Sequence, residues 1–128
     1  MDENKYITVI QTDLLENKEN VVYKGFANVS SGEVHTIKYD ENKDTSVVIT
    51  VTEEEAFLER VGEVTTKIHF KENQKTRASI VTQVGELRMS VNTEEITLKH
   101  NNLMLGYSLM QENNVVSRFN MKVKWENE

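Results

Sequence analysis

Apolar and polar residues alternate along the final segment of the chain, from Val115 to Trp125. One set of alternating positions is mainly apolar and comprises Val115, Ser117, Phe119, Met121, Val123 and Trp125. The other set is polar and includes Arg118, Asn120, Lys122 and Lys124. Successive side chains of a strand point to opposite faces of a sheet, so this pattern predicts a strand with one buried and one solvated face.

Segments of the same kind recur along the chain, separated by short polar turns. They cover residues 6–15, 21–30, 33–40, 46–52, 64–70, 76–84, 87–91, 95–99 and 103–111. Gly25 lies inside one of these segments and predicts a bend or bulge there. About ten segments are too many for one flat sheet with two exposed edges. The pattern therefore predicts an all-β protein, an antiparallel sheet that forms a closed or nearly closed barrel of about 8–10 strands.

The segment from Thr52 to Gly62 supports two readings. Thr52 and Glu55 have the spacing of a capping box, and Ala56 to Val61 fit a short helix that ends at Gly62. Alternatively, Glu53 and Glu54 form a hairpin tip and the following residues return as a strand. We predict the strand, because short connections usually join paired strands in such sheets.

The length and composition predict a single domain. A chain of 128 residues is most simply one β-barrel domain over residues 1–128, with residues 1–5 and 126–128 frayed. The sequence has no cysteine, which rules out disulfides and a thiol nucleophile and is compatible with a reducing compartment. The N-terminal residues lack a basic region followed by an apolar stretch, so we expect a cytoplasmic protein.

The charge balance bears on the class of partner. Asp and Glu number 21 against 15 Lys and Arg, a formal net charge of −6, which disfavours nucleic acid because its binding requires neutralisation of phosphates. No run approaches the length of about 18 apolar residues that a membrane-spanning helix needs. We therefore expect neither nucleic acid nor membrane as a partner.

Several short motifs resemble those of the YwiB-like proteins of Gram-positive bacteria. The motifs are residues 60–64 (Arg-Val-Gly-Glu-Val), Phe70, residues 84–87 (Val-Gly-Glu-Leu), Thr93, residues 107–109 (Tyr-Ser-Leu) and residues 120–123 (Asn-Met-Lys-Val). The resemblance covers the chain from about Glu33 onward. It implies a calycin-like, lipocalin-type barrel and favours a strand at 52–62. These relatives have no established activity, so no catalytic or binding residue is carried over from them.

The sequence contains no recognisable set of catalytic or metal-binding residues. His35, His69 and His100 are far apart and show no pairing on one strand, so we predict no metal site. Gly-x-Ser-x-Gly elbows and glycine-rich phosphate loops are absent. We therefore predict no cofactor, no catalytic residue and no enzymatic activity.

The best candidates for a ligand site are one arginine and several large apolar side chains. Arg60 follows Leu58 by two positions, which places it on the inner face or the rim, where its planar fork can bind a carboxylate or phosphate. Phe70, Met89 and Tyr107 belong to a set of methionine and aromatic residues that suits an adaptable apolar cavity. Two hypotheses follow. Either the barrel holds a small apolar or amphipathic molecule, or it is a solid protein-interaction module without a ligand.

The strand at 103–111 is apolar on both faces. Leu103, Leu105, Tyr107 and Leu109 form one face, while Met104, Gly106, Ser108 and Met110 form the other and carry no charge. Exposed apolar surface often marks a contact site, and identical subunits are the commonest way to cover it. We expect a homodimer with Met104 and Met110 near the contact. Internal cover by other residues of the same chain is the alternative.

Overall fold

The computed structural model describes residues 2–126 and contains ten strands and no helix within that range. The strands are β1 (Asp2–Asp13), β2 (Lys18–Ser30), β3 (His35–Asn42), β4 (Thr45–Val51), β5 (Glu55–Val61), β6 (Thr65–Lys71), β7 (Lys75–Thr82), β8 (Gly85–Lys99), β9 (Asn102–Gln111) and β10 (Asn114–Trp125). Each strand pairs antiparallel with its neighbours in the chain, and β1 pairs with β10 to close the barrel. The predicted fold class is confirmed.

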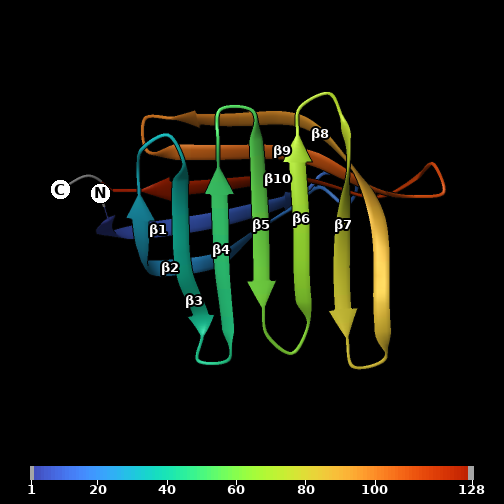
Figure 1. Ribbon diagram of the computed structural model, residues 1–128, viewed down its shortest axis with the longest axis horizontal. Coiled ribbons are helices and arrows are strands. Elements are labelled where there is room, and N and C mark those ends of the chain that lie inside the picture. The colour runs from blue at the N-terminus through green and yellow to red at the C-terminus, as the bar shows by residue number, and fades with distance from the viewer. Residues whose placement is uncertain (1, 127–128) are drawn as a thin grey trace.

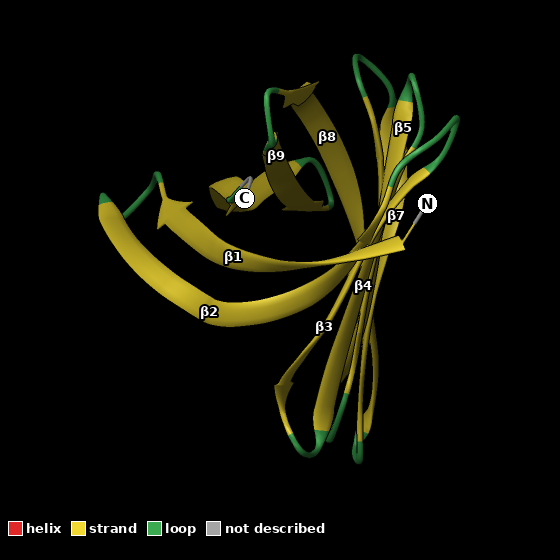
Figure 2. Ribbon diagram, turned by 90° about the vertical axis from the view of Figure 1, so that its left-hand side faces the viewer, coloured by secondary structure: helices red, strands yellow, loops and turns green. Residues whose placement is uncertain are grey.

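The barrel is flattened into two layers whose strands cross. Figure 1 shows β3 to β7 as upright ribbons, while β1, β2, β9 and β10 run crosswise behind them. The long strands β2 and β8 curve from one layer into the other (Figures 1 and 2). The register between β8 and β9 shifts between Thr93 and Glu95 of β8. The register between β1 and β2 shifts at Val22 of β2. Such bulges let a strand turn the corner between orthogonal layers.

The core lies between the two layers and follows the period-2 pattern of the sequence. Val47, Ile49 and Val51 on β4 are fully or almost fully buried. Phe70 on β6 is fully buried and meets Tyr107 of the opposite layer edge to face, with ring centroids 4.8 Å apart. Alternation therefore assigns the inner face correctly over most strands.

The ambiguous segment forms a hairpin and a strand, as predicted. Residues 55–61 form β5, which pairs with β4 and β6. Thr52 and Glu55 do interact, but they close a tight turn: the Thr52 N–H donates to the Glu55 carbonyl, and the Glu55 N–H donates to Thr52 Oγ1. The Thr-x-x-Glu spacing, typical of a helix capping box, thus also occurs at the tip of a hairpin.

Two local expectations concern the chain ends and Gly25. Asp2 to Lys5 continue β1 and pair with Ala27–Ser30 of β2. At the other end the Glu126 N–H donates to the Tyr6 carbonyl, and Met1 and residues 127–128 lie outside the described residues. The bulge in β2 lies at Val22, three positions before Gly25. At Gly25 the missing side chain makes room for Tyr23, whose hydroxyl would lie 2.6 Å from an added Cβ.

Candidate functional site

A cavity opens into the barrel at one end, between the two layers. Its volume is about 470 Å³. All the odd-numbered strands end at this end, which we call the open end, because neighbouring strands run in opposite directions. Residues from seven other strands surround the side chains of Tyr39 and Glu41 of β3 there: Val9, Gln11, Val22, Val47, Leu58, Arg60, Thr66, Ile68, Tyr107, Leu109, Phe119 and Met121.

One wall of the cavity carries an ion pair. Arg60 on β5 and Glu41 on β3 meet across β4, with Nη2 to Oε2 at 2.8 Å and Nε to Oε1 at 3.1 Å. The Glu41 side chain is 17% exposed and that of Arg60 is 39% exposed. The hydrogen bond to Glu41 raises the pKa of Arg60. Glu41 engages the Nε edge of the guanidinium and leaves the N–H groups of Nη1 without a protein acceptor among the described residues.

Two buried tyrosines add hydroxyl groups to the lining. Burial, and next the charge of Glu41, raise the pKa of Tyr39, which stacks on Tyr23 with centroids 4.4 Å apart. Burial raises the pKa of Tyr107 to about 12. Both phenols therefore stay protonated near neutral pH and can donate a hydrogen bond.

The wall formed by the crosswise layer is largely apolar. Leu109, Phe119 and Met121 lie on it, and it presents no charged side chain to the cavity. A molecule in the cavity thus meets a charged and hydroxyl-bearing wall on one side and a mostly apolar wall on the other. This arrangement suits an amphipathic molecule.

The four residues predicted to bind a ligand do not all meet at this cavity. Arg60 and Tyr107 line it. Phe70 lies deeper, packed against Tyr107. Met89 packs against the core and borders a separate hollow on the outside of the barrel. The assignment of ligand-binding roles to these residues stays a prediction.

Sequence reasoning missed Glu41 and Tyr39. The segment from Asp40 to Asp44 is rich in charge and looks like a turn, yet β3 continues to Asn42. The period of two that places Ile37 and Tyr39 inside also places Glu41 inside. Extending that alternation by one step would have found the partner of Arg60.

The open end is also where exposed apolar side chains gather. Fourteen large apolar side chains of the described residues are exposed, and eleven of them lie in or beside four of the five hairpins at this end. These eleven are Leu14, Leu15, Val21, Val22, Val61, Val64, Val81, Val84, Leu87, Val115 and Val116. At the opposite end only Val34 and Phe57 are of this kind within the described residues. Val115 belongs to the group because a register shift at Val116 removes it from the inner face, contrary to the predicted alternation.

The outer face of β9 is covered in part by side chains of its own chain. Arg118 of β10 reaches over it and its Nε donates to Ser108 Oγ at 3.2 Å, which leaves Ser108 buried. Asn120 lies against Gly106, where an added Cβ would be 3.0 Å from its Oδ1. Met104 and Met110 remain half-buried. The homodimer stays a prediction, with less uncovered surface to support it than the sequence indicates.

The histidines are separate from one another. His35 lies on β3, His69 on β6, and His100 in the turn between β8 and β9. Within residues 2–126 no three His, Cys, Asp or Glu side chains come together in a way that could hold a metal ion. The same residues form no helix long and apolar enough to cross a membrane.

Residues 5–123 match the profile of DUF1934, a domain of unknown function. The chain belongs to the DUF1934 family. The crystal structure of the YwiB protein from Bacillus subtilis has a similar fold, with a TM-score of 0.79 and 18% sequence identity over 99% of this chain and 93% of that chain. The resemblance to YwiB-like proteins is therefore confirmed, and the ten-strand barrel is consistent with the implied calycin-like fold. None of the curated proteins matches this sequence.

Proposed function

We propose that this DUF1934 protein binds a small amphipathic molecule in the open end of its barrel. The cavity of about 470 Å³ carries the proposal, because it lies within the range of roughly 300–1,000 Å³ typical of small-molecule sites. A solid lumen would instead have favoured the interaction module.

The distribution of polarity supports an amphipathic ligand over a purely polar one. The apolar part would lie against Leu109, Phe119 and Met121, and the polar part against Arg60, Glu41 and the Tyr39 hydroxyl. The exposed apolar side chains lie at the same end of the barrel as the cavity, and one of them, Val22, lines it. Exposed apolar surface concentrated in this way usually marks a binding region.

A matched pair of variants at the entrance tests the proposal. Thr66 lies inside the cavity, opposite Arg60 in the strand register, while Thr65 precedes it and points to the other face of β6. Thr66→Trp fills the cavity and Thr65→Trp adds the same side chain outside. Binding of 1-anilinonaphthalene-8-sulfonate, and its displacement by octanoate, should be lost in the first variant and retained in the second. Equal binding by both variants, or no binding by the wild-type protein, would exclude the cavity as the site.

A protein-interaction module is the second candidate, because the same exposed hairpins suit a partner surface. It predicts that Thr66→Trp has no effect on partner binding. We also propose a cytoplasmic location without a nucleic-acid or membrane partner, which the acidic, cysteine-free composition supports. The absence of enzymatic activity stays a prediction.

A further inference from the structure

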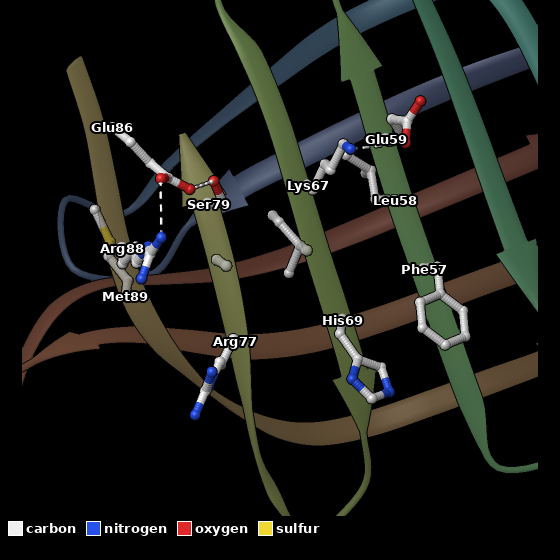
Figure 3. A pocket seen from close by; sticks show the side chains of 12 residues that line it. Phe57, Leu58, Glu59, Lys67, His69, Arg77, Ser79, Glu86, Arg88 and Met89 are labelled. Carbon is white, nitrogen blue, oxygen red and sulfur yellow. Dashed lines mark hydrogen bonds and ion pairs between the residues drawn. The ribbon is translucent and has the colours of Figure 1, made fainter. Parts of the chain in front are cut away.

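A second hollow lies on the outside of the barrel, over β5 to β8. Its volume is about 470 Å³, and Figure 3 shows the side chains around it. Backbone pairing between β6 and β7 ends at Ile68 and Ala78, after which the Thr76 hydroxyl donates to the His69 carbonyl. Ser79 is the small outward-facing residue of β7 that lines the hollow, and it is flanked in register by Lys67 on β6 and Arg88 on β8. A small residue between long neighbours leaves a slot.

An aromatic stack forms one side of this slot. The rings of Phe57 and His69 are nearly parallel, 7° apart, with centroids separated by 4.5 Å. Figure 3 shows Phe57, His69 and Arg77 in this order on three adjacent strands. Glu55 holds the His69 ring from the side, with Nε2 to Oε2 at 2.5 Å. One face of the imidazole thus contacts Phe57, and the other has no aromatic partner among the described residues.

The cations around the slot differ in how far they are already neutralised. Lys67 pairs with Glu59 at 3.8 Å, and Arg88 pairs with Glu86 at 3.2 Å. Hydrogen bonds from Ser79, and next from Arg88, lower the pKa of Glu86, which keeps that carboxylate ionised. Arg77 has no ion-pair partner among the described residues. The unneutralised positive charge of the slot therefore lies at Arg77, next to the aromatic stack.

We propose that this hollow is a second binding site, which takes a small planar anion: an aromatic ring that carries a carboxylate or phosphate. Neighbouring strands lie about 4.8 Å apart, close to the separation of the Phe57 and His69 rings. Ile68 pairs with Ala78, so the next outward-facing residues, His69 on β6 and Arg77 on β7, are neighbours across the two strands. A ring held over β7 between Arg77 and Ser79 can therefore stack on the free face of His69. Its anionic group then reaches the guanidinium of Arg77, which can bind it through two N–H groups.

The surrounding charges favour a small anion over a long one. Glu59 and Glu86 border the slot, and the chain as a whole has a formal net charge of −6. A polyanion such as nucleic acid would meet these carboxylates beyond the slot and be repelled. A compact anion can bind Arg77 and His69 without extending beyond the slot.

The three histidines provide an internal control for a test by nuclear magnetic resonance. His69 lies in the slot, whereas His35 borders a hollow at the opposite end of the barrel and His100 lies in the turn after β8. Benzoate and phenyl phosphate, added at constant pH and ionic strength, should shift the ring signals of His69 with saturation and leave those of His35 and His100 in place. Benzyl alcohol lacks the charge and cyclohexanecarboxylate lacks the planar ring, so each should bind at least about tenfold more weakly.

Two variants separate the contact from general charge effects. Arg77→Gln should weaken benzoate binding roughly tenfold or more, while Lys24→Gln, an equal change of charge on β2, should leave it unchanged. Ser79→Leu fills the slot and should abolish the His69 shift in a protein with an unchanged β-type circular dichroism spectrum. Phenyl phosphate binding without benzoate binding would assign the site to phosphates, and the reverse to carboxylates. An unmoved His69 signal at 20 mM of both anions, equal shifts of all three histidines, or an equal effect of Arg77→Gln and Lys24→Gln would overturn the proposal.

Discussion

The ion pair between Arg60 and Glu41 should respond asymmetrically to the loss of either partner. Glu41 is mostly buried, with 17% of its side chain exposed, whereas 39% of the Arg60 side chain is exposed. Arg60→Met leaves a buried carboxylate without its donors, while Glu41→Gln leaves a guanidinium that water can still reach. An exposed ion pair contributes about 0–1 kcal/mol, and removal of one partner of a fully buried pair costs about 3–5 kcal/mol. Because both side chains are partly exposed, we expect Arg60→Met to lower the unfolding free energy by about 2 kcal/mol and Glu41→Gln to lower it by about 1 kcal/mol.

The assay is urea unfolding followed by the fluorescence of Trp125, the single tryptophan of the chain. Trp125 pairs with Ile7, and it is not among the residues that line the cavity, so its signal reports unfolding. A loss of about 2 kcal/mol shifts the midpoint by roughly 1 M urea. The double variant should recover part of the loss, with a coupling energy of about 1–2 kcal/mol. A larger loss in Glu41→Gln than in Arg60→Met, or a coupling below about 0.3 kcal/mol, would show that the pair is solvated.

Three further predictions concern the core, the buried tyrosines and the outer face of β9. Phe70→Ala should lower the unfolding free energy, measured with urea, by about 3–5 kcal/mol, because the ring is fully buried. Phe57→Ala, where the ring is exposed, should lower it by less than about 1 kcal/mol. Folding raises the pKa of Tyr107 from 10.0 to about 12, so between these pH values only the unfolded chain releases the proton of this side chain. The contribution of Tyr107 to the unfolding free energy should therefore fall by about 1.4 kcal/mol per pH unit between pH 10 and pH 12. This stability is fully present below pH 10, and Tyr107→Phe should flatten the fall; an unchanged slope in that variant would contradict the assignment. Light scattering at tens of micromolar should give a dimer for the wild-type protein and a monomer for Met104→Glu, and monomers for both would exclude the dimer.

Local alternation was enough to predict the fold, because each strand buries one face against a single core. The positions of Val47, Ile49, Phe70 and Val123 inside the barrel follow directly from the period of two. What alternation could not locate were the places where the period is interrupted. The bulges at Val22, Glu94 and Val116 change the face of every residue that follows. The position of a bulge depends on where its strand passes from one layer to the other, and that position is determined by the closed barrel as a whole.

The candidate site was only partly predictable for the same reason. Arg60 was identified because Leu58 two positions earlier fixes its face. Its partner Glu41 lies 19 residues away and meets it across β4, a proximity that depends on the order of strands. The slot over Ser79 depends on three strands and on the point where β6 and β7 separate. Such a feature has no signature in any one segment.

The most direct test of the proposed function is nuclear magnetic resonance of the protein with labelled methionine methyl groups. Met121 lines the cavity, while Met104 and Met110 lie on the outer face of β9. Octanoate should shift the Met121 methyl signal with saturation and leave the signals of Met104 and Met110 in place. Octanol should act in the same way at higher concentration, because it lacks the group that Arg60 binds. A Met121 signal that stays unmoved up to the solubility limit of octanoate, while the other methionine signals shift, would contradict a ligand site inside the barrel.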